Sequence, residues 1–380
     1  MARPTRPFDP GDPFDALARR QGLRVPSGPA RRGPRKVYRP RTANEWLVDD
    51  AVRRSLRISG LADVIARSTT RALREKVFDP LLARVDGIPE YRFGGNPIQR
   101  EVEAVVREGM EQVYGSLVSD FRQLADIESA WQARTIIRRA PVEIHLNRLS
   151  VAQVDAVATS KPFEGRLLRG YWSDLSKKTQ RRVNVAISEG IVDGKTTPEI
   201  VRSLRGTRVN AFKDGVLQTT RRHAEALTRT WTQHVSQTAR QNVIAENADV
   251  IGAWQFVATL DSRTTMTCMA HDGKVYENGK GEIHRPPLHW NCRSTTVPVL
   301  KGWEELGLVE PPPSTRASMD GEVAGTVDYE SWLRSKPESF QNEVLGEPRA
   351  KLFRDGMPIE DMVTRTGRPL SLRELAAVDD

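Results

Sequence analysis

The stretch from residue 252 to residue 300 constrains this chain most, because it holds both cysteines of the protein and three of its six histidines. Cys268 and His271 are three residues apart, and so are His289 and Cys292. Residues at this spacing can lie on one short turn and direct two side chains at one point. Turn-forming dipeptides surround short β-prone runs in the same stretch. The pattern predicts a small β-rich knuckle, residues 252–300, held by a metal ion or a disulfide.

Zinc is the metal that this residue set favours. Zinc prefers four tetrahedral ligands, which are drawn mainly from Cys and His. The chain supplies C-x-x-H and H-x-x-C with 17 residues between the inner pair, and Asp272 could replace a histidine. The predicted ligands of a structural site that serves folding are Cys268, His271, His289 and Cys292. Two alternatives stay open: the cysteines could form a disulfide, or both could be ordinary buried thiols.

A catalytic interpretation of the same stretch is a metal-dependent nuclease. HNH-type nucleases combine histidines with a metal on a small ββα motif, and Arg263 and Arg293 could hold a phosphate. The residues that follow Cys292 indicate a strand, however, where that motif needs a helix. The chain also has no P-loop, no dinucleotide-binding G-x-G-x-x-G, no H-E-x-x-H and no G-x-S-x-G motif. We therefore expect no catalytic residues and no enzyme, with the nuclease as the alternative.

Positive charge is concentrated in the N-terminal tail. The formal net charge is +9, and residues 1–44 contain eleven Lys or Arg and three Asp, a net charge of +8. A basic, proline-rich arm favours contact with a polyanion, here double-stranded DNA. The alternative is a solvated tail with no fixed partner, because salt screens charges beyond ~10 Å. The cations expected to contact DNA are Arg31, Arg32, Arg35, Lys36, Arg39 and Arg41.

The remaining patterns are mostly helical. A chain of 380 residues is expected to form two or more domains. The chain has no run of 18 apolar residues, so we expect no transmembrane helix. Its two cysteines fit a reducing compartment. We predict an α+β fold that is predominantly helical, with helical bundle domains, the Cys/His knuckle and a helical C-terminal tail. The expected segments are a disordered basic arm (1–43), a helical N-terminal domain (44–140), a domain whose helices lead into the knuckle (141–308), a linker (309–327) and the helical tail (328–380).

Helix and strand signals place the main elements. Apolar residues recur every three or four positions from Ile98 to Leu124, which predicts a helix of more than 20 residues. Ser176 is a candidate N-cap, and Thr196 and Glu199 have capping-box spacing. A further helix is expected from about residue 220 to 246, and strands at 253–260, 274–276 and 295–299.

Several runs in and before the knuckle resemble a known family. They are Ala186–Gly190, Gly194–Ile200, Thr259–Thr264, Cys268, Asp272–Tyr276, Pro286–Arg293 and Val297–Val299. These residues resemble the phage head-morphogenesis family, the minor head proteins similar to the F protein of phage Mu. The similarity covers roughly residues 140–300, and more weakly 328–376. It makes residues 141–308 the expected head-morphogenesis domain.

The resemblance implies a structural, low-copy virion protein inside the head, which is present in the host cytoplasm during assembly. Such proteins associate with the portal and with capsid or scaffold proteins, and some bind DNA; none of these roles involves a membrane. Relatives often carry further cysteines at the positions of Thr265 and Ser294, and both are absent here. His271 would have to supply the missing ligand.

Overall fold

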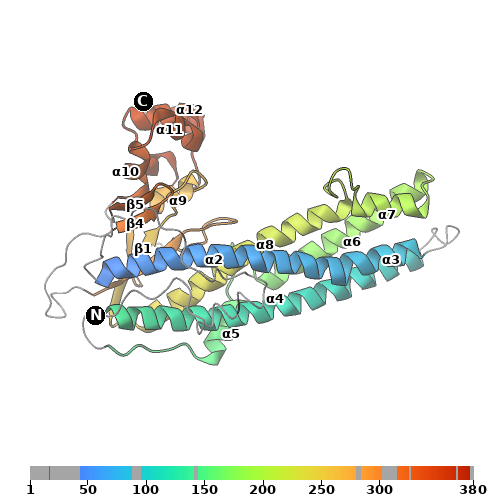
Figure 1. Cartoon of the computed structure of the whole chain (residues 1–380), viewed down its shortest axis with the longest axis horizontal. Coiled ribbons are helices and arrows are strands. Elements are labelled where there is room, and N and C mark those ends of the chain that lie inside the picture. Colours follow the sequence, from blue (N-terminus) through green and yellow to red (C-terminus); the bar gives the residue numbers. More distant parts are fainter. Residues whose placement is uncertain are drawn as a thin grey trace, which may run out of the picture. The chain divides into compact units, whose positions relative to one another are not determined.

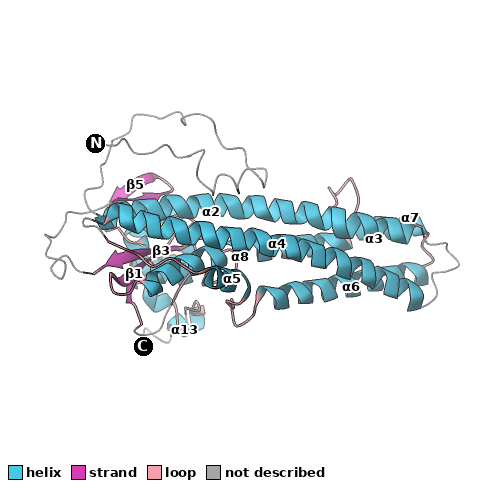
Figure 2. Cartoon of the chain, turned by 90° about the horizontal axis from the view of Figure 1, so that it is seen from below, coloured by secondary structure: helices cyan, strands magenta, loops and turns pink. Residues whose placement is uncertain are grey.

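The computed structural model describes residue 17 and residues 43–87, 96–140, 144–279, 284–301, 315–324, 327–364 and 367–376. This part of the chain is α+β and predominantly helical, as predicted (Figure 2). Within these ranges, no helix combines the length and the apolar character that a bilayer crossing requires. The predicted arm lies outside the described residues except for residues 17 and 43, and all six of its named cations lie outside them.

The chain forms two compact units, each of which combines stretches that are distant in the sequence (Figure 1). Of the described residues, unit 1 comprises those within Gly60–Ile127 and Val151–Val235, together with Leu17. Unit 2 comprises the described residues within Ser27–Ser59, Glu128–Ser150 and Ser236–Asp380. Three long helices contribute residues to both units. The helical elements before the sheet are α2 (Ala43–Leu73), η1 (Arg74–Phe78), α3 (Asp79–Asp86), α4 (Asn96–Arg139), α5 (Val151–Thr159), α6 (Leu168–Val192), α7 (Thr197–Arg205) and α8 (Val216–Glu246).

Sequence signals account for most of these helix ends. The long amphipathic helix predicted after residue 97 is α4, which ends immediately before Ala140 and Pro141. The capping box at Thr196 and Glu199 is confirmed at the start of α7. The cap predicted at Ser176 is wrong, because α6 begins eight residues earlier. Buried residues in the first two turns, among them Trp172, extend the apolar stripe toward the N-terminus.

Unit 1 is a bundle in which side chains join neighbouring helices. Trp172 of α6 donates its Nε1–H to the carbonyl of Met110 in α4, at 2.8 Å. The hydroxyls of Thr179 in α6 and Thr220 in α8 share a buried hydrogen bond of 2.8 Å. On α4, a Cβ at Gly109 would lie 2.1 Å from the carbonyl oxygen of Lys76 in η1. Only glycine permits so close an approach of these two helices.

The sheet of unit 2 has three antiparallel strands. They are β1 (Ile251–Val257), β2 (Val275–Glu277) and β3 (Thr295–Leu300), in the order β2-β1-β3. They lie where the sequence predicted strands. Trp254 and Phe256 of β1 are fully buried against both cysteines and against Leu47, Ile136 and Ile244 of the helices. The hydrophobic core of unit 2 therefore surrounds the cysteines.

A buried polar network fixes α8 to β3 and α4 within unit 2. Arg240 of α8 donates to the Thr295 hydroxyl at 3.0 Å, the Thr296 carbonyl at 3.0 Å and Gln132 at 2.9 Å. Burial lowers the pKa of Arg240 to about 10, so the guanidinium is still protonated at neutral pH. Because each guanidinium nitrogen donates to a partner, this buried charge specifies how the sheet meets the helices.

The C-terminal part of unit 2 contains a hairpin that the sequence did not predict. Strands β4 (Thr315–Ser318) and β5 (Gly321–Ala324) pair antiparallel inside the segment expected to be a linker. The helical tail follows, and its apolar residues, including Trp332 and Phe353, share a core with Leu260 and Met269. Its elements are α10 (Tyr329–Arg334), α11 (Glu338–Leu345), α12 (Glu347–Arg354), η3 (Ile359–Met362) and α13 (Leu372–Ala376).

Two glycines of α4 should respond oppositely to the same substitution. Gly109→Ala forces a methyl group against the backbone of η1, so we expect a loss of about 1–3 kcal/mol of unfolding free energy, or more. Gly115 is exposed, and no atom lies within 4 Å of the point that a Cβ would occupy there. Gly115→Ala should therefore stabilise by about 0.5–1 kcal/mol through helix propensity. Urea unfolding of both variants measures the two signs, and a neutral Gly109→Ala would contradict the close approach.

Candidate metal centre

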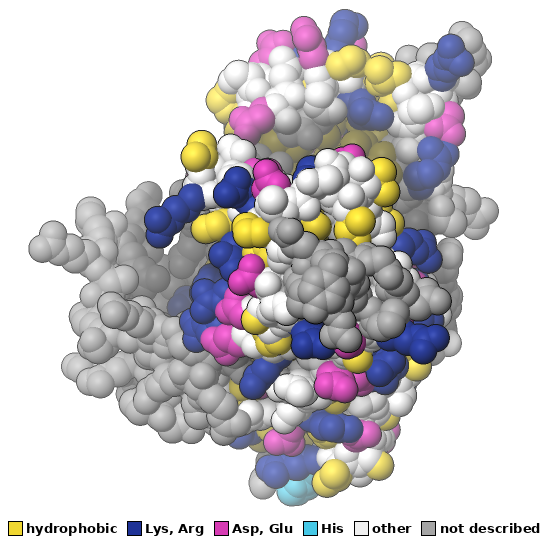
Figure 3. Space-filling model, turned by 90° about the vertical axis from the view of Figure 1, so that its right-hand side faces the viewer, with side chains coloured by type: hydrophobic (Ala, Val, Ile, Leu, Met, Phe, Trp, Pro, Cys, Tyr) yellow, Lys and Arg dark blue, Asp and Glu magenta, His cyan; other side chains and the backbone are white. Residues whose placement is uncertain are grey.

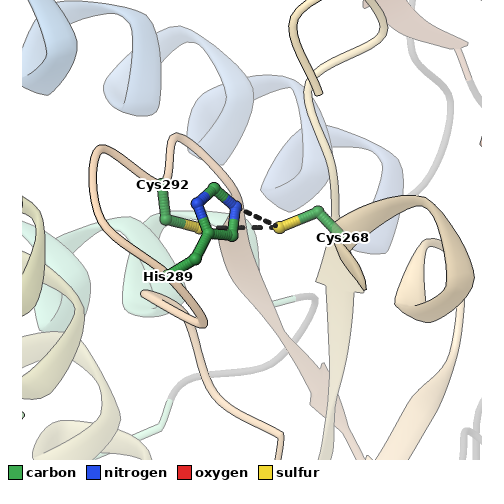
Figure 4. Close-up of side chains that lie close together, drawn as sticks. All are labelled: Cys268, His289 and Cys292. Carbon is green, nitrogen blue, oxygen red and sulfur yellow. Dashed lines mark hydrogen bonds between the residues drawn. The ribbon is translucent and has the colours of Figure 1, made fainter. Parts of the chain in front are cut away.

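Two short segments of unit 2 carry the cluster that the sequence analysis identified. Helix α9 (Met266–His271) starts after Thr265, which has an extended backbone, and presents Cys268 from its first turn. His289 and Cys292 lie on the loop before β3, where the Cys292 N–H donates to the His289 carbonyl at 3.2 Å. Asn291 closes this turn with a φ of 59°, a left-handed conformation that Asn tolerates better than most residues. The loop thereby directs both side chains at Cys268 (Figure 4).

The distances within the cluster fit a tetrahedral ion. The two sulfurs are 3.6 Å apart, and Cys268 Sγ is 3.2 Å from His289 Nε2. A zinc ion with bonds of about 2.3 Å to sulfur and about 2.0 Å to nitrogen implies separations of about 3.8 and about 3.6 Å. The ligand atoms of Cys268, His289 and Cys292 all lie within 4.8 Å of one another. Both cysteines are free thiols, so the structure contains the metal-ready arrangement and not the disulfide.

Protonation within the cluster favours a thiolate. The hydrogen bond between the sulfurs lowers the pKa of Cys292 and raises that of Cys268, so Cys292 is the sulfur that loses its proton more easily. Burial opposes protonation of His289, but the Cys292 sulfur and the Trp290 carbonyl raise its pKa above the ordinary value. Thiolate is the form that binds metal, and a metal ion would replace the proton of the imidazole.

His271, the fourth predicted ligand, lies in a separate cluster. Its Nδ1 is 2.6 Å from the Tyr276 hydroxyl, and its ring stacks on His284 with centroids 4.4 Å apart. Burial, together with the charges of His284 and Lys274, lowers the pKa of His271 to about 4. The structure therefore brings together three of the four predicted ligands and places His271 as a neutral packing residue.

Two hydroxyls occupy the side of the cluster where relatives were expected to carry further cysteines. Thr265 and Ser294 both hydrogen-bond with Cys268, and Thr265 Oγ1 is 2.9 Å from His289 Nε2. A cavity of about 20 Å³ opens there, which is room for about one water molecule. The departure from the family pattern was visible in the sequence, but the role of the hydroxyls was not. A metal ion held by the three side chains would have room for about one water molecule beside these hydroxyls.

Asp272, the alternative ligand, is bound elsewhere. Its carboxylate accepts two hydrogen bonds from Arg316 of β4, at 2.7 and 2.9 Å. It also accepts from the backbone N–H groups of Ala258 and Tyr329, each at 2.7 Å. The Asp272 side chain is 0% exposed and that of Arg316 is 5% exposed. This joint, Asp272 with Arg316, holds the hairpin and the first C-terminal helix against the strand that ends at Val257.

Asp261, a further described carboxylate near the cluster, is also paired. Asp261 accepts two hydrogen bonds from Arg293, at 2.5 and 2.8 Å, and Arg263 is exposed beside it. Among the described residues, the three-ligand group contains no carboxylate. The arrangement can hold a metal ion, but within the described part of the knuckle it offers no unpaired carboxylate beside the cluster as a general base.

One comparison with known proteins gives a match. Residues 181–297 match the family model described as Phage Mu protein F like protein. The matched stretch begins within α6, ends in β3 and contains all three cluster residues. No curated protein and no solved structure matches this chain. The resemblance seen in the sequence is therefore confirmed over these residues.

Breaking the joint should be much more destabilising than breaking an exposed ion pair. Arg316→Met leaves the Asp272 carboxylate buried without its partner, so we expect a loss of about 3–5 kcal/mol of unfolding free energy. Lys274→Met removes an ion pair with Glu360 whose side chains are 46% and 59% exposed, and should cost less than about 1 kcal/mol. Denaturant unfolding compares the two variants.

The double variant Asp272→Asn with Arg316→Met provides the control for charge. It removes the buried, unpaired carboxylate and should recover part of the lost unfolding free energy. Equal stability of the Arg316→Met and Lys274→Met variants would show that the joint contributes no more than a surface pair.

Proposed function

We propose that this chain, a phage Mu F-like head-morphogenesis protein over residues 181–297, is a minor structural protein of the head of a tailed phage or prophage. The observation that carries this conclusion is the family match, which includes the whole metal-ready cluster. We infer a location inside the virion head, reached through the host cytoplasm during assembly. We also propose that the head-morphogenesis domain extends to residues 141–308, beyond both ends of the match.

The proposed partners are the portal protein and the capsid or scaffold proteins. The buried groups of unit 2 support a holding role, because they stabilise structure and do not face substrate. Both cluster sulfurs belong to cysteines that are 1% exposed, and the joint and the Arg240 network are buried. Zinc in the cluster would bind Cys268, His289 and Cys292, with the fourth position taken by water.

Double-stranded DNA is the further partner that we propose for the N-terminal arm. Residues 1–44 hold a net charge of +8, and contacts from Lys and Arg to phosphate are independent of base sequence and weaken as salt rises. The arm cations Arg31, Arg32, Arg35, Lys36, Arg39 and Arg41 are the proposed contacts.

A three-ligand site with room for water is also the arrangement of a catalytic zinc site, but the surrounding residues do not favour the nuclease alternative. The segment after Cys292 forms β3, which pairs with β1 over six residue pairs, where an HNH motif needs a helix. The nearest carboxylates, Asp261 and Asp272, are bound by arginines. A structural role, without catalytic residues, agrees better with this geometry and with the family.

The head assignment predicts where the protein is found. In induced cells that carry the phage, the tagged full chain should co-purify with portal protein and remain in density-purified heads. A soluble host protein with the same tag, expressed in the same cells, is the control for non-specific trapping. Recovery of the chain only in the soluble fraction, with no portal protein bound, would contradict the proposal.

The cluster predicts one zinc ion per chain. Protein purified without chelator should contain one equivalent by elemental analysis, and Cys292→Ala or His289→Ala should remove it. His271→Ala should retain it, because His271 lies in the separate cluster with Tyr276. Metal should be released as pH falls, since the ligands must lose protons to bind.

A gain-of-ligand variant makes the zinc test independent of folding defects. Thr265 lies 2.9 Å from His289 Nε2, so Thr265→Cys should add a fourth ligand and slow the loss of zinc to a chelator. Metal-free protein with two freely titrating thiols, or zinc lost equally in His271→Ala and His289→Ala, would exclude the three-ligand site.

A further inference from the structure

A second basic region lies in the folded body, separate from the arm. Residues 176–222 contain eleven Lys or Arg and four Asp or Glu, a net charge of +7. The arm carries +8 and the whole chain +9, so the remaining residues sum to −6. The net charge of the whole chain does not reveal this second basic region, because the negative charge of the remaining residues offsets its positive charge. All of residues 176–222 belong to unit 1.

The cations follow the outer surface of α6 and continue onto α8. Lys177 and Arg181 are four residues apart on α6, as are Lys178 and Arg182, and this spacing places the members of each pair about 6 Å apart along the helix axis. Helices α6 and α8 lie side by side (Figure 1) and are joined by the buried Thr179–Thr220 bond.

The pKa of His223 in α8 shows that the cations of α6 act on the neighbouring helix. Burial lowers its pKa first, and the charges of Arg182 and Lys178 lower it further. The neighbouring Arg222 is exposed. The α6 cations therefore act on the same surface that α8 presents. In Figure 3, which faces the α7 end of these helices, Lys and Arg side chains are spread over the surface with acidic side chains between them.

Within the described part of the chain, most of these cations have no ionic partner, while most of the carboxylates in the segment do have partners. Among the described residues, only Lys195 and Arg221 of the eleven form ion pairs. Asp193 binds Lys195, and Glu199 is held in the α7 capping box. Asp214 accepts hydrogen bonds from Thr207 and Asn210. Most carboxylates of the segment are thus bound within it, whereas most of its Lys and Arg side chains can bind an external anion.

Lys177 and Arg181 lie at the edge of this surface, because they also line a mixed-charge hollow on the α4 side of α6. A cavity of about 480 Å³ between α4 and α6 is lined by Lys177 and Arg181, but also by Glu103 and Glu189. Those carboxylates weaken the attraction for an anion on that side. The favourable direction for a long polyanion is therefore along the ridge of α6 and across toward α8.

The surface offers few apolar anchors for a protein interface. Among the described residues of α6 and α8, the exposed large hydrophobic side chains are Val185, Ile191 and Val192, all of which follow Arg182 on α6. Protein interfaces depend on buried aromatic and aliphatic anchors, whereas phosphate contacts need only cations and hydrogen-bond donors. The chemistry favours a nucleic acid over an acidic protein.

We propose that the α6–α8 basic face, formed by Lys177, Lys178, Arg181, Arg182 and Arg222, binds the phosphate backbone of double-stranded DNA independently of base sequence. The choice of DNA as the polyanion rests on the proposed location inside the head. The face is a second DNA contact, distinct from the N-terminal arm, and it is built on helices whose positions are fixed by packing in unit 1.

The test compares three charge-neutralised forms of the full-length chain. The face variant is Lys177→Gln, Lys178→Gln, Arg181→Gln and Arg222→Gln, all at exposed positions. The control removes the same charge from exposed, ion-paired cations: Arg53→Gln, Arg84→Gln, Lys274→Gln and Lys351→Gln. The arm variant replaces Arg31, Arg32, Arg35, Lys36, Arg39 and Arg41 with Gln. Thermal melts confirm that each form is folded.

Fluorescence anisotropy with a random-sequence duplex of about 30 base pairs, from about 50 to about 300 mM salt, gives the affinity and its salt dependence. Each lost phosphate contact reduces the slope of log K against log salt by about 0.9. We expect the face variant to lose about 2–4 in slope and at least about tenfold in affinity at about 100 mM salt, and the control to lose less than about 1 in slope.

The outcomes separate this inference from the proposed function. A face variant that binds like the control overturns the inference, even if the arm variant loses binding and the chain is still found in heads. If only the face variant loses binding, the arm proposal fails and the inference stands. Capture of poly-glutamate in preference to the duplex would also overturn it, because it would indicate an acidic protein partner.

Discussion

The arrangement of unit 2 depends on one buried carboxylate. Asp272 accepts hydrogen bonds from the end of the central strand, from β4 through Arg316, and from the first residue of α10. A buried, unpaired carboxylate would be far costlier than an exposed one, so these three segments are energetically coupled. Asp272 also follows α9 directly, and α9 presents Cys268. The same contact that docks the C-terminal helices therefore positions one ligand of the cluster.

The second segment of the cluster, the loop that carries His289 and Cys292, is fixed by other contacts. Arg293, the residue after Cys292, binds Asp261 through two hydrogen bonds, and its carbonyl accepts from Ser55 of α2 at 3.0 Å. The two ligand-bearing segments are thus held by buried or half-buried ion pairs on each side. A small zinc finger is unfolded without its metal because nothing else brings its ligands together. Here the fold itself brings the sulfurs within 3.6 Å.

Sequence patterns revealed what depends on local spacing and missed what depends on tertiary partners. Apolar periodicity located the long helices and the three strands of the sheet, and the Cys/His spacing found three side chains that meet. His271 has the same spacing, yet its position is decided by Tyr276 and His284, which no local pattern connects to it. The hairpin β4–β5 was missed because Pro- and Ser-rich sequence around it indicates a linker, while its order depends on Arg316 reaching Asp272. The basic α6–α8 face was hidden by averaging over an acidic remainder.

The hydroxyls beside Cys268 limit how much a metal ion could stabilise this part of the fold, so buried ion pairs must supply more of the stability. Thr265 and Ser294 stand where further cysteines were expected, and a hydroxyl keeps much of the volume of a thiol without its affinity for soft metals. With three ligands and room for about one water, the site would bind zinc less tightly than a closed four-ligand site. The cross-linking that a fully ligated metal would supply must come from other contacts. The Arg316–Asp272 joint holds the segment that follows Cys268, and the Arg240 network holds β3, which follows Cys292. A metal ion bound here would therefore add to a fold that is already held by buried charge.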